Sequence, residues 1–86
     1  MAWEVGLSAA AFGFLGNMER RDAERLTKKL EDAAENPSHY LERLTGHDEF
    51  RLRIGDHRAI ILLLHEKKMM YVESIAHRKK AYKKKN

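Results

Sequence analysis

The chain has no cysteine, and only one of its 86 residues is proline. Without cysteine it can form no disulfide, and it offers neither a thiol nucleophile nor a thiolate ligand for zinc. Its longest uninterrupted apolar run, residues 59–64, is far shorter than the roughly 18 residues that a membrane-spanning helix needs. We therefore expect a protein that does not enter membranes and whose chemistry uses no cofactor and no metal ion.

The N-terminal residues resemble a secretory signal only in part. Residues 5–16 carry no charge, but residues 1–4 hold a glutamate in place of the basic residues with which such signals begin. We therefore expect a cytoplasmic protein. The apolar content of 43% is sufficient for a packed core, and the length allows only one. The prediction is a single domain over residues 1–86, in which residues 77–86 form a basic C-terminal tail.

Positive charge is concentrated at the end of the chain. Residues 1–76 contain eleven Lys and Arg against thirteen Asp and Glu, whereas residues 77–86 contain six basic residues and no acidic one. A block of one sign is typical either of a solvated terminus or of an arm that contacts phosphates, and the charge pattern leaves both open. No apolar face or lipidation signal accompanies the block, which disfavours a membrane surface as its partner.

The start of the sequence predicts a strand followed by a short helix. Residues 3–7 alternate apolar with small or polar side chains, as in a strand, and Ser8 is placed to cap a helix. Apolar residues then recur at helical spacing, namely Phe12, Leu15 and Met18. Glycine costs about 1 kcal/mol relative to alanine inside a helix, so we expect this helix to end near Gly16. Phe14 lies off that stripe, which predicts an exposed apolar patch suited to binding a partner protein or to self-association.

Residues 19–35 predict a longer amphipathic helix. One face carries the residues at i, i+3, i+4 and i+7, namely Ala23, Leu26, Thr27, Leu30, Ala33 and Ala34, and charged side chains cover the other. Pro37 ends the helix, and the apolar Tyr40, Leu41 and Leu44 suit a connecting segment that packs on the core.

The second half of the chain changes to the period of strands. Residues 50–54 alternate strictly, Gly55 and Asp56 suit a two-residue hairpin turn, and residues 58–64 form a nearly continuous apolar strand, typical of a central position in a sheet. A further strand follows at residues 69–76. The predicted fold is α+β with the order β-α-α-β-β-β, a small antiparallel twisted sheet with two N-terminal helices on one face.

The hairpin brings arginines together. With Gly55 and Asp56 as the loop, the facing pairs are Ile54 with His57, Arg53 with Arg58, Leu52 with Ala59, and Arg51 with Ile60. Arg51, Arg53 and Arg58 then share the face that the helices leave uncovered. Two like charges roughly 5.5 Å apart repel by about 1 kcal/mol in water and roughly 3 kcal/mol at an effective dielectric of about 20.

Such a cluster favours an anion, because a phosphate that bridges guanidinium groups turns repulsion into charge-assisted hydrogen bonds. Two alternatives remain open. The arginines could pair with nearby carboxylates, for which Asp48, Glu49, Asp56 and Glu73 are candidates, or lie along the sheet with their heads in water. A one-residue bulge at the turn would also break the opposition of Arg53 and Arg58.

Several stretches occur in an order and spacing typical of one protein family. They are residues 3–5, 28–31, 36–37, 44–46, the hairpin FRLRIGDHR at 50–58, and residues 75–82, which end in HRKKAY. Together they resemble the RelE toxins of prokaryotic toxin–antitoxin pairs, within the RelE/ParE superfamily. The resemblance implies a metal-independent endoribonuclease, or mRNA interferase, that cuts messenger RNA in the ribosomal A site. It also implies a cognate RelB-like antitoxin as partner.

The resemblance further implies roles for individual residues. In family chemistry the ribose 2′-hydroxyl attacks the adjacent phosphate, which requires a base, cations around the phosphorane and a proton for the departing 5′-oxygen. Arg53 and Arg58 match positions that stabilise the phosphorane, Arg78 matches the leaving-group side, and Tyr82 matches the base or an aligning group. Arg51 matches a contact to the RNA backbone. The tail lysines Lys79 and Lys80 are assigned to substrate binding by their charge.

His77 has two interpretations. Histidine titrates near neutral pH, so His77 could serve as an acid or base in contact with the substrate, or it could simply end the last strand. The other histidines show no spacing typical of metal ligands, and we assign no metal site.

Two further functions fit the same sequence. A ParE-like toxin would inhibit DNA gyrase by binding and cut no RNA, and a basic RNA-binding module would bind without strand scission. The arginine set with the tail tyrosine favours the nuclease. The first helix, by contrast, lacks the Lys and Arg that family members carry there, which disfavours its contact with ribosomal RNA.

Overall fold

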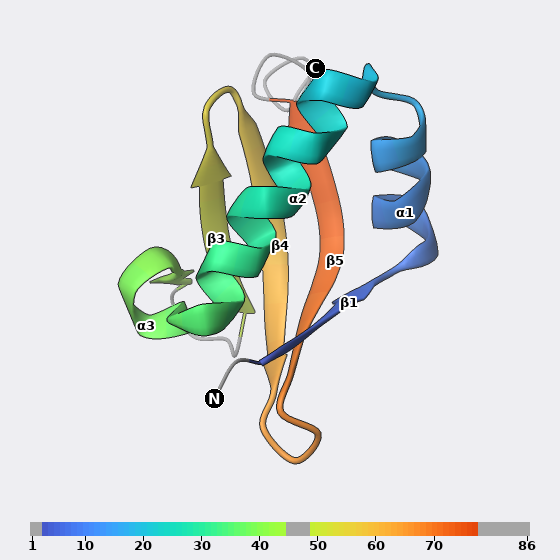
Figure 1. Ribbon diagram of the computed structural model, residues 1–86. Helices are drawn as coiled ribbons and strands as arrows, with labels where there is room; N and C mark the ends of the chain where they lie inside the picture. The colour runs from blue at the N-terminus through green and yellow to red at the C-terminus, as the bar shows by residue number, and fades with distance from the viewer. Residues whose placement is uncertain (1–2, 45–48, 78–86) are drawn as a thin grey trace, which may run out of the picture.

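The computed structural model describes residues 3–44 and 49–77. In this part the elements are β1 (Glu4–Leu7), α1 (Ala9–Gly16), α2 (Arg20–Glu35), α3 (Pro37–Tyr40), β2 (Glu42–Arg43), β3 (Glu49–Ile54), β4 (His57–Leu64) and β5 (Met69–His77). The strands form one sheet in the order β1-β5-β4-β3-β2 (Figure 1). The α+β fold is confirmed. The short α3 and β2 are additional, and both lie in the segment expected to connect helix and hairpin.

The sheet is antiparallel except at one edge, where β1 runs parallel to β5. At this edge Gly6 lies opposite Tyr71. A Cβ atom at Gly6 would come within 2.7 Å of the Met69 Sδ atom, so a larger residue at position 6 would displace the flexible Met69 side chain.

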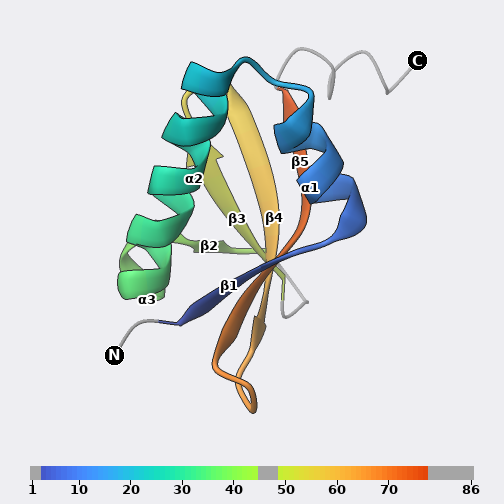
Figure 2. The same ribbon diagram turned by 45° about the vertical axis from the view of Figure 1, so that its right-hand side comes forward.

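Helices α1 and α2 both lie on one face of the sheet (Figure 2). The apolar stripe of α2 forms the centre of the core: Leu26 is 2% exposed and Leu30 is 1% exposed. Thr27, at the margin of the predicted stripe, is exposed. The sheet contributes the remaining large core residues, namely Leu52, Ile54, Ile61, Met70, Val72 and Ile75. Successive strand residues point to opposite faces, so these apolar side chains lie on the face of the sheet that packs against the helices.

Ser8 connects α1 to the sheet, as its predicted capping position requires. Its hydroxyl oxygen accepts a hydrogen bond from the Ala11 backbone N–H at 3.0 Å. The same hydroxyl donates to the Glu73 carbonyl at 2.6 Å. The pairing of β4 with β5 shifts by one residue at this point, since Ile60 faces Ser74 while Ile61 faces Val72. Ser8 therefore caps α1 and also bonds the extra residue of a β-bulge.

The packing face of α1 differs from the prediction. Ala11 is fully buried, and Phe14, Leu15 and Met18 pack against the core, whereas Phe12 is 70% exposed. The prediction that Phe12 packs inward with Phe14 off the stripe is therefore wrong. Positions 11, 14, 15 and 18 also follow helical spacing, and the small side chain at position 11 allows the helix to approach the sheet closely.

In the described part of the chain no helix packs on the opposite face of the sheet, which we call the open face. None of the helices in this part is both long and apolar enough to span a membrane.

Candidate functional site

The β3–β4 hairpin has the predicted register. Its facing pairs are Ile54 with His57, Arg53 with Arg58, Leu52 with Ala59, and Arg51 with Ile60. Gly55 has a φ of 58°, the left-handed conformation that the first residue of a two-residue hairpin turn of type II′ adopts. The turn contains no bulge, so the opposition of the two arginines is confirmed.

Three predicted site residues meet on the open face. Leu52 is 2% exposed and Ile54 is 6% exposed on the helix side, so the alternating residues of β3 and β4 point away from the helices. These are Arg51 and Arg58, which are half-buried, and Arg53, which is exposed. Arg53 and Arg58 stand directly opposite each other near the turn, and Arg51 lies two residues further along β3.

Arg51 has an internal partner that the sequence analysis missed. Its Nη2 atom donates to Glu42 Oε1 at 2.8 Å, across the pairing of β2 with β3. The hydrogen bond from Arg51 and then its charge hold the pKa of the Glu42 carboxyl below its usual value, and the charge of Arg53 acts in the same direction. Glu42 was not considered because a strand as short as β2 gives no periodic signal in the sequence.

Arg53 is the most accessible cation of the cluster. Among residues 3–44 and 49–77 Arg53 makes no ion pair, so no carboxylate in this part of the chain fixes the position of its guanidinium group. The open face therefore presents positive charge at the hairpin end, in the geometry in which a phosphate could accept hydrogen bonds from two strands at once.

His77 lies away from this cluster. It pairs in register with His57 at the end of β5, and the two rings are 4.9 Å apart at an angle of 87°. Phe14 of α1 contacts the His57 ring at 5.8 Å, which places both histidines on the helix side of the sheet. The structure thus does not bring His77 to the arginines, and its contact with substrate stays a prediction. Arg78, Lys79, Lys80 and Tyr82 lie outside the described residues.

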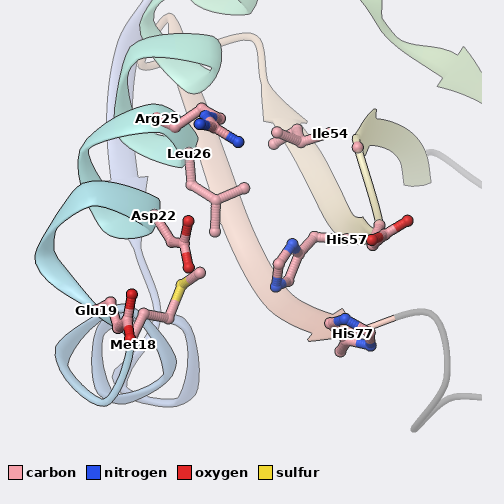
Figure 3. A pocket seen from close by; sticks show the side chains of 10 residues that line it. Met18, Glu19, Asp22, Arg25, Leu26, Ile54, His57 and His77 are labelled. Carbon is pink, nitrogen blue, oxygen red and sulfur yellow. The ribbon is translucent and has the colours of Figure 1, made fainter.

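A cavity of about 490 Å³ adjoins the histidines on the helix side (Figure 3). Burial, followed by the charge of His77, lowers the pKa of His57, while Asp22 and Asp56 oppose the shift. The cavity lining includes the carboxylates of Glu19, Asp22 and Asp56 but a single arginine, Arg25. This charge balance does not suit a phosphate, which leaves the open face as the candidate for an anion site. Among the described residues no group of three or more His, Asp or Glu could hold a metal ion.

Comparisons with known proteins agree with this fold. A family model described as ParE toxin of type II toxin–antitoxin system, parDE, matches residues 10–82. No curated protein sequence matches the chain.

Among solved structures, the RelBE2 toxin–antitoxin complex of Mycobacterium tuberculosis is similar with a TM-score of 0.78 and 17% identity, over 91% of this chain and 93% of that chain. A mutant of the Escherichia coli toxin RelE in the free state has a TM-score of 0.74 and 23% identity, over 95% of this chain and 90% of that chain. The archaeal RelE–RelB complex of Pyrococcus horikoshii has a TM-score of 0.72 and 19% identity, over 91% and 97%. At sequence identities this low, the structural likeness shows that these proteins share a fold and shows nothing more about this chain.

Proposed function

Since this chain belongs to the ParE toxin family of type II toxin–antitoxin systems, we propose that it is a ribosome-dependent endoribonuclease that cuts messenger RNA. The toxin acts in the cytoplasm, cleaves in the ribosomal A site without a metal ion, and so stops translation. The observation that carries the proposal is the opposition of Arg53 and Arg58 on the open face, with Arg51 beside them on β3.

The arginines support this chemistry by their charge. The ribose 2′-oxygen attacks the adjacent phosphorus, its proton passes to a base, and the bond to the 5′-oxygen breaks as that oxygen gains a proton. Negative charge accumulates on the phosphorane between these events. Arg53 and Arg58 approach it from two strands and stabilise it by charge-assisted hydrogen bonds. An arginine stays protonated near neutral pH, so the proton transfers fall to other groups. Tyr82 is proposed as base or aligning group, and Arg78 is proposed to stabilise the charge on the leaving 5′-oxygen by a hydrogen bond.

A single-stranded RNA suits the open face because that face is cationic and no helix of residues 3–44 and 49–77 covers it. In this proposal Arg51 and the tail lysines Lys79 and Lys80 bind the sugar-phosphate backbone. Affinity from such contacts depends strongly on salt concentration.

The proposed partner is a cognate RelB-like antitoxin. Two of the similar solved structures are toxin–antitoxin complexes, one of RelBE2 and one of RelE with RelB. An acidic segment of an antitoxin complements the arginine face, and its carboxylates would occupy the place of the phosphates. Binding there blocks access of RNA.

The second candidate function is inhibition of DNA gyrase, because the matching family model is described as a ParE toxin. The scaffold is compatible with both functions. The two differ in chemistry, since a gyrase inhibitor needs no cations arranged around a reacting phosphate.

The test is primer extension on a messenger during translation in vitro. We compare the wild type with Arg58→Ala and Tyr82→Ala, and use Arg21→Ala, an exposed position on α2, as the matched control. The wild type and the control should cut within A-site codons, and the other two variants should lose the cuts.

Different outcomes identify the alternatives. If all four proteins are inert on messenger RNA and the wild type traps gyrase on DNA, the second candidate replaces the first. If the wild type binds RNA in a salt-dependent way but leaves it intact, the protein is a binding module.

A further inference from the structure

The Glu42–Arg51 ion pair links the edge strand β2 to the strand that carries two of the three arginines. The Arg51 side chain is 30% exposed, whereas that of Glu42 is 63% exposed. The Arg51 Nε atom is buried and has no hydrogen-bond partner among the described residues. A buried N–H group without an acceptor is unfavourable. Because Nε makes no hydrogen bond, it does not fix the orientation of the guanidinium group. The contact of Nη2 with Glu42 does.

Glu42 also lies where it can influence the rest of the cluster. The pKa of its carboxyl is lowered by Arg51 and further by the charge of Arg53, so the carboxylate is within electrostatic reach of both. A carboxylate and a phosphate oxygen accept the same charge-assisted hydrogen bonds from guanidinium. Glu42 thus competes with an RNA phosphate for Arg51.

We propose that Glu42 is a positioning residue of the RNA site, which anchors Arg51 from β2 and reduces the positive charge that Arg51 offers to the RNA backbone. The inference rests on the proposed function, because it concerns the same face. Its consequence is that Arg51 serves as a fixed side of the site, while Arg53 supplies accessible charge next to the reacting phosphate. Glu42 lowers affinity for polyanions in general and keeps Arg51 in one orientation.

The ion pair itself is tested without RNA. The pKa of the Glu42 carboxyl is measured by NMR pH titration in the wild type and in Arg51→Gln. We expect the pKa to lie below its usual value in the wild type and to rise toward that value in the variant. If the two proteins give the same pKa, the pair does not form in solution and the inference is overturned whatever the RNA measurements show.

The role in RNA binding is tested by the salt dependence of affinity. The ligand is a single-stranded RNA with a 2′-deoxynucleotide at the cleavage site, so that binding is measured without scission. In Glu42→Gln the released Arg51 pairs with a phosphate, and the slope of log K against log salt should steepen by about 0.7. Over a fourfold rise in salt this equals an additional loss of affinity of about threefold. Adding Arg51→Gln to Glu42→Gln should abolish this steepening, because no cation at position 51 is then left to pair with a phosphate.

A matched control removes the same charge elsewhere. Glu31→Gln lies on the exposed surface of α2, on the side of the sheet away from the arginines, and should leave the slope unchanged. With unmodified messenger, Glu42→Gln should lower both KM and kcat, because it binds RNA more tightly but no longer fixes Arg51. A loss of packing alone would not lower KM.

Failure of the inference can be told from failure of the proposed function. If the wild type cuts RNA and Glu42→Gln matches Glu31→Gln in slope, KM and kcat, Glu42 has no positioning role and the proposed function stands. If the wild type neither binds nor cuts RNA, the proposed function and the role of Glu42 in an RNA site are both overturned, even where the titration shows the ion pair.

Discussion

Replacing one of the two opposed arginines should stabilise the free protein. Arg53 and Arg58 face each other across β3 and β4, and two unit charges at a cross-strand spacing of about 5 Å repel by about 1 kcal/mol in water. Arg53 is exposed, so its head can turn away from Arg58 and solvent ions screen it. We therefore expect Arg53→Gln to raise the free energy of unfolding by about 0.5 kcal/mol at low salt.

The assay is urea denaturation at two salt concentrations. At about 0.01 M salt the screening length is about 30 Å and the gain should be largest, whereas at about 1 M it is about 3 Å and the gain should vanish. The control Lys67→Gln removes the same charge from an exposed position in the turn between β4 and β5. It should change the free energy of unfolding much less, because no arginine faces it across a strand pair.

Inorganic phosphate provides the complementary measurement. A ligand that binds only the folded state at about ten times its Kd stabilises that state by about 1.4 kcal/mol. Phosphate should therefore stabilise the wild type more than Arg53→Gln, and should reverse their order of stability. The reasoning is refuted if Arg53→Gln is less stable than the wild type at low salt, or if phosphate stabilises the two equally. Either result would mean that the guanidinium groups do not share an anion site.

Two further predictions concern stability. Ser8→Ala removes the cap of α1 and the hydrogen bond to the Glu73 carbonyl, and should lower the free energy of unfolding in urea by about 1–2 kcal/mol; an unchanged midpoint would contradict the dual role of Ser8. The pKa of His57 is lowered from 6.5 in the folded state, so the unfolded chain binds the proton more readily. Stability should fall as the pH drops from 6.5 through the folded pKa. His57→Gln should show a smaller fall and the control His39→Gln the same fall as the wild type.

The hairpin was predictable because its determinants are local. Residues 50–54 alternate strictly, and a glycine follows where a two-residue turn needs a positive φ. Once the loop length is known, the register follows by counting, and with it the opposition of Arg53 and Arg58. The longer helix was predictable for a similar reason, since its apolar stripe repeats over four turns.

The first helix shows where local pattern was not sufficient. Two sets of apolar positions, one with Phe12 and one with Phe14, both follow helical spacing over only eight residues. The choice between them depends on the distance between helix and sheet, which Ala11 and the Ser8 contact to β5 determine. The sequence pattern alone does not distinguish the two sets.

The sequence by itself thus determined the order of the longer elements, the hairpin register and the side of the sheet on which the arginines lie, because each depends on neighbours within a few residues. Only the tertiary structure decided which carboxylate meets Arg51, that β1 runs parallel to β5, and that His77 turns to the helix side beside His57. These features come from strands that are far apart in the chain or too short to give a periodic pattern. Their pairing is selected by the packing of the whole core rather than by any local preference.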